Sequence, residues 1–257
     1  MRSPIRGGAM DSTPPALRLF VLHHAGGSHV LYRHWPVGLP DTWDVRLLDA
    51  PGHGFLLDQP RIADAGRLAD HLLRHIEPEL TCPYALFGHS MGALLAYEIT
   101  RRAVDRDLPP PVWVGVSART APQLAVPGRR YHALPEAELR ERLKALGGTP
   151  DNVFDDPGLW TLFEPVIRND LRLVETWRPA PRTGPLPVAL SAYAGAGDLH
   201  ASPPRMAGWE EHSERFLGLR VFDGGHFYFQ DDPRPLLRRI EQDATTALDA
   251  VTATRSS

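Results

Sequence analysis

Short apolar runs alternate along the chain with longer segments in which apolar positions recur at helical spacing. The runs at 17–22, 45–48, 84–87 and 112–117 are rich in aliphatic and aromatic residues, as buried strands are. Between them, Ile62–Ile76 places its apolar residues on one helical face, and a second helix is predicted over Met91–Val104. Strands that alternate with helices indicate a mostly parallel sheet covered by helices on both faces.

The alternation stops between about residues 119 and 185, where no buried strand is predicted. Helices are expected there instead, at Pro135–Leu146, Pro157–Phe163 and Pro165–Trp177. The alternation then resumes with a strand at Pro187–Tyr193, a helix around Arg205–Arg215, a strand at Leu219–Phe222 and a final helix from Pro233. We therefore predict a single α/β domain over residues 16–257 with a helical lid inserted at about 119–185. An insertion between two strands of such a sheet projects from the edge where the active-site loops lie.

Composition narrows the class of protein. Of the 257 residues 42% are apolar and 23% are charged, which is ordinary for a globular protein. The net charge of −3 gives no electrostatic reason to expect nucleic acid or an anionic membrane as a partner. The single cysteine excludes an internal disulfide. Residues 1–15 lack the apolar core of a signal peptide and are expected to be a disordered leader, so a cytoplasmic location is predicted.

The segment Gly88-His89-Ser90-Met91-Gly92 reads G-x-S-x-G and lies between a predicted strand and a predicted helix. A sharp turn in that context lifts a serine hydroxyl clear of the sheet, where it can act as a nucleophile. The helix that follows points free N–H groups toward a developing oxyanion. In the alternative interpretation, the segment is a glycine-rich turn whose serine only caps the helix.

A catalytic serine needs a base, and the base needs a carboxylate that orients it. In this topology the chain order is serine, then acid, then histidine. Beyond the lid the candidates for the base are His200, His212 and His226. His226 follows the strand at 219–222 through two glycines, whereas His212 falls in a predicted helix and His200 lies too close to the candidate acid. We predict His226 as the base.

Asp198 is the predicted acid because it follows the strand at 187–193 through a glycine-rich turn. It lies 108 residues after Ser90 (198 − 90) and 28 residues before His226 (226 − 198). Asp223 is the alternative, but it lies on the same loop as the base and three residues before it, from where reaching the ring nitrogen is awkward.

An oxyanion hole requires two donors. One is expected to be the backbone N–H of Met91, and the other that of Ala25, in the His24-Ala25-Gly26-Gly27 loop after the first strand. The His23-His24 pair and the pair His71 and His75 lack carboxylate or cysteine companions at a ligand spacing, so no metal site is predicted. No phosphate-binding or dinucleotide motif is present either, and we expect no cofactor.

Several of these motifs together resemble the type II thioesterases, the stand-alone editing enzymes of polyketide and nonribosomal peptide assembly lines. The motifs are His24-Ala25-Gly26-Gly27-Ser28, Tyr32-Arg33 with Trp35, Ala50-Pro51-Gly52-His53-Gly54, Gly88-His89-Ser90-Met91-Gly92, Leu146-Gly147-Gly148-Thr149-Pro150 and Gly224-Gly225-His226-Phe227. The resemblance implies an α/β-hydrolase fold and hydrolysis of acyl thioesters on the phosphopantetheine arm of acyl or peptidyl carrier proteins. The sequence departs from the family pattern at His53, where arginine is common, and over residues 55–60, which lack the usual arginine and glutamate.

The resemblance also implies that the lid controls access of the acyl chain. Candidates to line an acyl cavity are Leu159, Trp160, Phe163, Val166 and Trp177, and each has packing of the lid helices as its alternative role. Arg129 and Arg130 are candidates to attract an acidic carrier protein. Two other functions stay open: a carboxylesterase, lipase or acyltransferase of the same fold, and a non-catalytic protein that binds carrier proteins.

Overall fold

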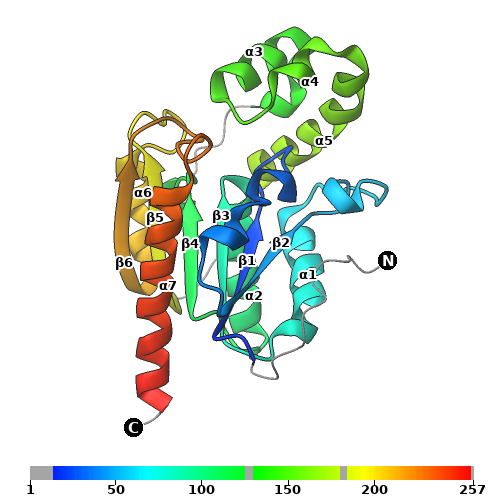
Figure 1. The fold of residues 1–257 in the computed structure, drawn as a ribbon. Coiled ribbons are helices and arrows are strands. Elements are labelled where there is room, and N and C mark those ends of the chain that lie inside the picture. The colour runs from blue at the N-terminus through cyan, green and yellow to red at the C-terminus, as the bar shows by residue number, and fades with distance from the viewer. Residues whose placement is uncertain (1–13, 125–129, 180–183, 256–257) are drawn as a thin grey trace.

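A single parallel sheet forms the centre of the molecule (Figure 1). The computed structural model describes residues 14–124, 130–179 and 184–255, so most of the predicted leader lies outside the described residues. The sheet has six strands in the order β2-β1-β3-β4-β5-β6, and each neighbouring pair runs parallel. The strands are β1 (Leu17–Leu22), β2 (Trp43–Leu48), β3 (Tyr84–His89), β4 (Trp113–Ser117), β5 (Leu186–Gly195) and β6 (Ser213–Phe222). The predicted α/β class is confirmed.

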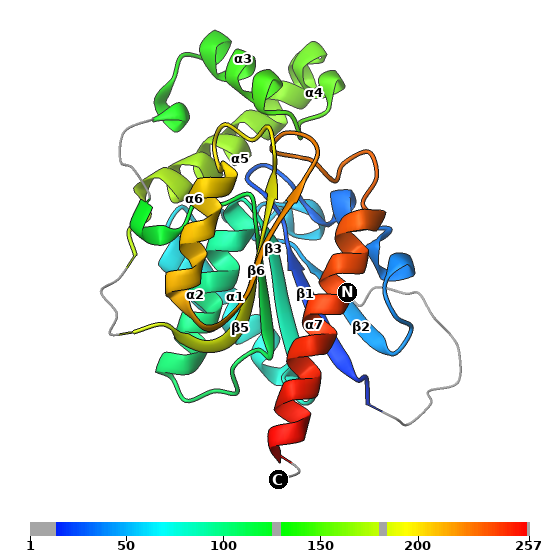
Figure 2. The same ribbon diagram turned by 90° about the vertical axis from the view of Figure 1, so that its left-hand side faces the viewer.

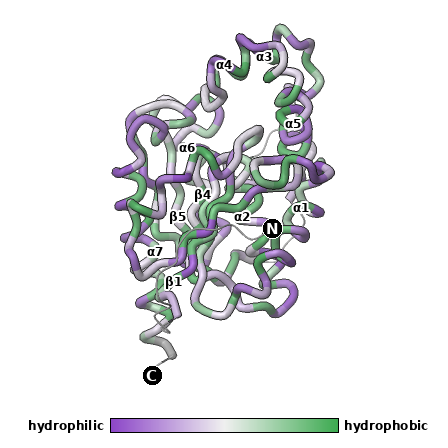
Figure 3. The backbone as a smooth tube through the Cα atoms, turned by 45° about the vertical axis from the view of Figure 1, so that its right-hand side comes forward, coloured by the Kyte–Doolittle hydropathy of each residue, from purple (hydrophilic) through white to green (hydrophobic). Residues whose placement is uncertain are grey.

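Helices cover both faces of the sheet (Figure 2). On one face lie α1 (Ala65–Ile76), α2 (Met91–Asp105) and α6 (Pro203–Ala207), and on the other lies α7 (Arg234–Arg255). A separate hydrophobic cluster fills the space between the sheet and each helical layer. Because strands in the middle of such a sheet face helices on both sides, β3 and β4 are buried along their whole length. In Figure 3 the strands at the centre are accordingly coloured largely as hydrophobic.

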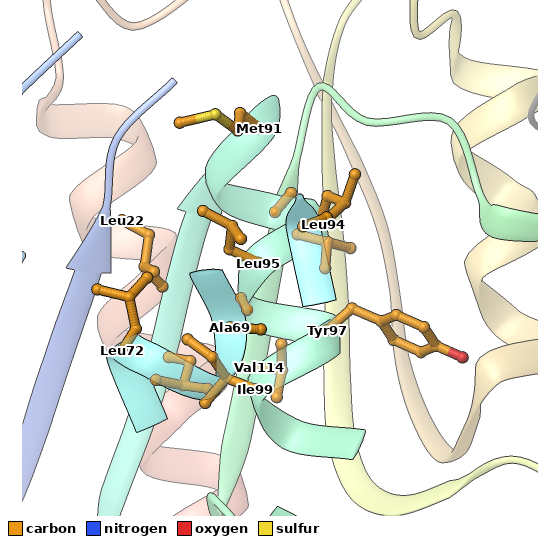
Figure 4. Packing of buried hydrophobic residues seen from close by; sticks show 14 of the residues in the cluster. Leu22, Ala69, Leu72, Met91, Leu94, Leu95, Tyr97, Ile99 and Val114 are labelled. Atoms are coloured by element: carbon orange, nitrogen blue, oxygen red, sulfur yellow. The ribbon is translucent and has the colours of Figure 1, made fainter. Parts of the chain in front are cut away.

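The packing of α1 shows how the sequence pattern produces this core. Asp64 caps the helix by accepting a hydrogen bond from the Arg67 amide at 2.8 Å. The buried residues then recur at helical spacing: Ala65, Leu68, Ala69, Leu72, Leu73 and Ile76. Figure 4 shows this face meeting Leu95 and Ile99 of α2. Each fully buried leucine contributes about 1.5–3 kcal/mol, so Leu72→Ala is expected to loosen the contact between α1 and α2.

Between β4 and β5 the described residues form three α-helices that project beyond the sheet (Figure 1), and we call residues 130–177 the helical insertion. They are α3 (Glu136–Leu146), α4 (Asp151–Asp155) and α5 (Pro157–Thr176). The sequence did not predict α4, and the expected break before Pro165 is wrong, because α5 runs continuously through it. The backbone bond lost at Pro165 is offset by the burial of Val166, Ile167 and Leu173 along one face of α5.

The predicted helix around Arg205–Arg215 is also wrong in its extent. Only α6 and a short 3₁₀ turn at Gly208–His212 are helical, and β6 begins at Ser213 rather than at Leu219. The strand Ser213–Phe222 is an edge strand with mostly half-buried residues, so its first half lacks the apolar run of a central strand. Pairing with β5 decides its conformation, as tertiary contacts often do for edge strands.

Candidate active site

Ser90 lies in a tight turn between β3 and α2, with the backbone held at φ 55° and ψ −107°. The glycines on either side permit this turn. A Cβ on Gly88 would lie 2.0 Å from the Gly92 carbonyl oxygen, and one on Gly92 would lie 2.2 Å from that of Leu22. Ser90 makes no side-chain capping hydrogen bond to α2, so the alternative role as a helix cap is not supported.

Asp198 and His226 meet at the same edge of the sheet. Because all the strands are parallel, the loops after β3, β5 and β6 lie along that edge. His226 Nδ1 donates to Asp198 Oδ2 at 2.7 Å, and both residues are buried. Asp198 Oδ1 accepts from the His200 amide at 2.8 Å and from the Ala201 amide at 3.1 Å.

This environment keeps the Asp198 carboxylate ionised. Burial alone raises the pKa of Asp198, but the hydrogen bond and charge of His226 and the two amides hold it below its ordinary value. An ionised acid fixes the His226 tautomer with the proton on Nδ1, which leaves Nε2 free to accept a proton. The ring of His226 lies 5.1 Å from that of His89, the residue directly before Ser90.

His24 and His89 lie near His226, but within the described residues no carboxylate is hydrogen-bonded to either ring. Burial, together with His23 and His226, lowers the pKa of His24 to about 3. Burial also lowers the pKa of His89 well below its ordinary value, with smaller effects of His226 and His24. His89 Nδ1 is bonded to Ser117 Oγ at 2.9 Å, and Ser117 Oγ to Tyr228 OH at 2.8 Å. These two hydrogen bonds connect the strand before Ser90 with the loop that carries His226.

The two predicted oxyanion donors lie on segments that pack closely. Met91 is the first residue of α2, so its amide has no partner within the helix. The close approach of Gly92 to the Leu22 carbonyl brings the start of α2 against the end of β1. Ala25 follows β1 by three residues and packs against the hydrophobic cluster beneath α2.

The remaining candidates from the sequence lie apart from this pair or only support it. Asp223 is exposed, and it is Asp198 that bonds His226. His212 lies on the 3₁₀ turn before β6, where Nε2 is bonded to Gln123 Oε1 at 2.6 Å. His200 is a neighbour of the base, with its ring 6.1 Å from that of His226. Across the residues that the structure describes, no group of three or more His, Cys, Asp or Glu could hold a metal ion.

Comparison with known proteins identifies the family of this chain. The sequence matches the family described as "Thioesterase domain" over residues 17–244. The chain belongs to this thioesterase family. It is 32% identical over 217 residues to thioesterase PikA5 of Streptomyces venezuelae, which covers 84% of this chain and 76% of that protein.

Solved structures of thioesterases are similar along nearly the whole chain. RedJ, a thioesterase from the prodiginine biosynthetic pathway of Streptomyces coelicolor, has 32% identity and a TM-score of 0.84, covering 94% of this chain and 96% of its own. BorB, a type II thioesterase from the borrelidin biosynthetic cluster, has 34% identity and a TM-score of 0.81, with 90% and 94% covered. The predicted resemblance to type II thioesterases and the hydrolase fold are confirmed, and the family supports an enzyme that hydrolyses thioesters.

The helical insertion of this thioesterase contacts the edge of the sheet at which Asp198 and His226 meet. A Cβ on Gly148, in the turn between α3 and α4, would lie 2.1 Å from Phe227 Cζ, so this turn packs directly on the residue after His226. In α5, Asp170 Oδ2 accepts a hydrogen bond from the Gly26 amide at 2.7 Å, next to Ala25. The insertion therefore contacts both the loop of the predicted base and the loop of the predicted oxyanion donor.

The five predicted acyl-cavity residues of the thioesterase have different surroundings. Trp160 and Phe163 belong to the insertion's own small hydrophobic cluster. Trp177 packs into the large cluster beside α2, and its Nε1–H donates to Glu98 Oε1 at 3.1 Å. Val166 is buried and Leu159 half-buried, and neither belongs to any of the three hydrophobic clusters.

One buried pair, Asp170 with His53, was missed in the sequence. His53 Nε2 donates to Asp170 Oδ2 at 2.8 Å, and both side chains are almost fully buried. The signal that was available is the spacing Val166, Ile167, Asp170 and Leu173, which puts a carboxylate on the apolar stripe of α5. A charged residue at such a position needs a buried partner.

Proposed function

We propose that this chain is a serine thioesterase that hydrolyses acyl groups from the phosphopantetheine arm of acyl or peptidyl carrier proteins. In this role it removes aberrant or stalled chains during polyketide or nonribosomal peptide biosynthesis. The observation that carries the proposal is the buried His226–Asp198 hydrogen bond on the same sheet edge as the strained turn of Ser90. Membership of the thioesterase family identifies the scissile bond as a thioester.

In the proposed mechanism, Ser90 Oγ attacks the thioester carbonyl carbon while His226 Nε2 takes the hydroxyl proton. The Met91 and Ala25 amides donate to the resulting oxyanion, and Asp198 stabilises the imidazolium. Collapse of the tetrahedral intermediate breaks the C–S bond, and His226 returns its proton to the departing thiolate. Water activated by His226 then cleaves the acyl-enzyme and releases a carboxylic acid and Ser90. Apart from the substrate, each step uses only protein groups and water, so the proposal requires no metal or cofactor.

We further propose that residues 16–257 form one domain whose insertion, at about 119–185, acts as a lid. The contacts of Gly148 with Phe227 and of Asp170 with Gly26 support this role, since both lie beside proposed catalytic groups. Val166 and Leu159 fit an acyl-lining role better than Trp160, Phe163 and Trp177, which pack within hydrophobic clusters.

The proposed macromolecular partner is an acidic carrier protein. Arg130 is exposed at the start of the helical insertion and carries a charge suited to such a partner, while Arg129 lies outside the described residues. No nucleic acid or membrane partner is proposed, in keeping with the net charge of −3. None of the helices within the described ranges is long and apolar enough to cross a bilayer. A cytoplasmic location remains our proposal.

The test compares three substrates that carry the same acyl group: a thioester on a carrier protein, a thioester of free pantetheine, and an oxygen ester of matched structure. The wild type is expected to hydrolyse both thioesters, with a higher kcat/KM on the carrier protein than on pantetheine. Ser90→Ala should lower kcat by about 10⁴-fold or more. A strong preference for the ester would favour a carboxylesterase, and carrier binding without hydrolysis would favour a binding protein. Arg130→Ala should reduce kcat/KM on the carrier protein only.

A further inference from the structure

Asp170 is a buried carboxylate that the proposed mechanism does not use. It lies on α5 with 1% of its side chain exposed. Its Oδ2 accepts from the Gly26 amide at 2.7 Å and from His53 Nε2 at 2.8 Å, while Oδ1 accepts from Asn169 Nδ2 at 3.2 Å. A buried carboxylate is costly unless such partners compensate it, so the position calls for an explanation.

His53 is built to carry a positive charge toward Asp170. Its Nε2 faces the carboxylate, and its Nδ1 faces the carbonyl oxygens of Pro51 at 3.2 Å and Ala50 at 3.3 Å. Both nitrogens thus face acceptors, which suits an imidazolium with two N–H donors. Burial alone lowers the pKa of His53, but the hydrogen bond and charge of Asp170, with the two carbonyls, raise it above its ordinary value.

The histidine next to this pair has the opposite character. The ring of His23 lies 4.6 Å from that of His53. Its Nε2 accepts from the Ala50 amide at 3.1 Å, which requires a neutral ring, and its Nδ1 donates to the His24 carbonyl at 2.8 Å. Burial and the neighbouring His53 lower the pKa of His23 to about 4, against weaker effects of the His24 carbonyl, Asp170 and Asp49. One ion pair, His53 with Asp170, therefore lies against the end of β1.

The pair bears directly on the loop of the second oxyanion donor. The Gly26 amide that Asp170 fixes belongs to the peptide immediately after Ala25. Gly26 has φ 73°, and a Cβ there would lie 2.7 Å from Ile167 Cγ1, one helical turn before Asp170. Helix α5 thus holds this loop through one polar and one apolar contact, with no space between them for a larger residue at position 26.

We propose that Asp170 is a positioning residue, held in place by His53, that seats helix α5 of the insertion on the Ala25–Gly26 loop and thereby forms the second half of the oxyanion hole. This rests on the proposed function, in which the Ala25 amide is an oxyanion donor. A displacement of α5 would turn this amide away, so a poorly seated lid would leave the active site with a single donor. Loss of one oxyanion donor costs about 10²–10³-fold in kcat, and partial misalignment costs less.

The test uses two substitutions of Asp170 and one control on the same helix. Asp170→Ala removes the acceptor for Gly26. Asp170→Asn removes the charge but keeps an oxygen at the Oδ2 position, which can accept from both the Gly26 amide and His53 Nε2. Glu164→Gln, the control, breaks a partly exposed ion pair with Arg168 on α5 and leaves the acceptor for the Gly26 amide in place. Each variant is assayed for kcat and KM on an acyl-pantetheine and for Ki with an alkyl trifluoromethyl ketone, whose hemiketal with a serine carries an oxyanion.

Asp170→Ala is expected to lower kcat and to raise the Ki of the ketone together by about 10- to 100-fold, with KM changed much less. In Asp170→Asn, kcat and Ki should remain within about fivefold of the wild-type values, because the amide oxygen still accepts from Gly26. The small loss reflects the weaker bond of a neutral acceptor. The ¹⁹F resonance of the bound ketone should shift in Asp170→Ala and stay in place in Glu164→Gln. Assays are run well below the Tm of each variant, so a loss of stability alone leaves the Ki unchanged.

Three results would overturn the proposal: wild-type kcat and Ki in a folded Asp170→Ala, a loss of kcat with an unchanged Ki, or an equal loss in Asp170→Asn. Failure of the proposed function itself appears elsewhere. In that case the wild type fails to hydrolyse the acyl-pantetheine, or Ser90→Ala still forms the ketone adduct.

Discussion

Helices α1 and α2, which pack on the sheet, bury a larger share of their residues than the helices of the insertion do. Helix α2, against the sheet, buries 11 of its 15 residues. Helix α3, in the insertion, buries only Leu139 and Leu143 of its 11 residues. The insertion's own cluster has six buried members, whereas the two clusters on the sheet faces are each far larger. The stabilisation from apolar burial scales with buried area. The sheet with the helices packed on it, which we call the platform, is therefore expected to resist unfolding more than the helical insertion does.

Helix α5 belongs to both regions, and this explains how they work together. Trp160 and Ile167 pack in the small cluster of the insertion, but Leu173 lies in the large cluster of the sheet. The C-terminal end of α5 is therefore packed on the sheet, while its N-terminal part packs with α3 and α4. The proposed triad thus lies on the platform, whereas the loop of one proposed oxyanion donor is hydrogen-bonded to α5, the helix that links the platform to the insertion.

The largest expected effect tests whether the chemistry depends on the platform. Asp198→Asn should lower kcat by about 10⁴-fold, because an amide no longer fixes the tautomer of His226 or stabilises its charged form. Asp223→Asn is the matched control, since Asp223 is exposed and lies three residues before the proposed base. Steady-state hydrolysis of an acyl-pantetheine measures both. An equal loss in the two variants would remove Asp198 from the proposed triad.

A smaller effect separates the two hydrophobic regions. Leu173 and Leu139 are both fully buried, the first in the sheet cluster and the second in the insertion. Leu173→Ala should lower the global free energy of unfolding by about 2–4 kcal/mol. Leu139→Ala should instead speed amide hydrogen exchange in α3 and α4 with little change in global unfolding. Urea denaturation and exchange mass spectrometry check this, and equal global losses would show that the two regions unfold as one unit.

The smallest effect measures the link between the regions as a function of pH. The raised pKa of His53 means that its stabilisation is complete below about pH 6.5 and is lost as pH rises through the folded pKa. The lowered pKa of Asp170 acts at the other end, where its stabilisation is lost as pH falls through the folded pKa.

The stability difference between the wild type and His53→Gln should therefore shrink as the pH rises from 6 to 9. Chemical denaturation across that range gives the difference. His75→Gln, at an exposed position on α1, is the control and should show no such trend. A difference that is constant or grows with pH would contradict a charged His53 in the folded state.

Much of this architecture follows from local pattern. The central strands were predicted because burial on both faces makes β3 and β4 apolar throughout. The expected residues Ser90, Asp198 and His226 follow from their positions after strands, since parallel strands bring those loops to one edge. Whether these residues catalyse the reaction stays a prediction, although Asp198 and His226 do lie in contact.

The rest depends on contacts that the sequence pattern does not contain. Helix α5 continues through Pro165 because its buried face outweighs one lost bond, and β6 begins early because it pairs with β5. The His53–Asp170 bond joins residues 117 positions apart, on a loop and on an insertion. Neither partner shows at its own place in the chain what it contacts in space.

The backbone angle at Ser90 also bears on how this protein would evolve in the laboratory. A non-glycine residue at φ 55° and ψ −107° costs about 1–3 kcal/mol, and glycine adopts such angles without that cost. Selection for heat resistance alone would thus reward the loss of the serine, and glycine would be the favoured replacement. A library sorted without a turnover assay would enrich for inactive clones at position 90.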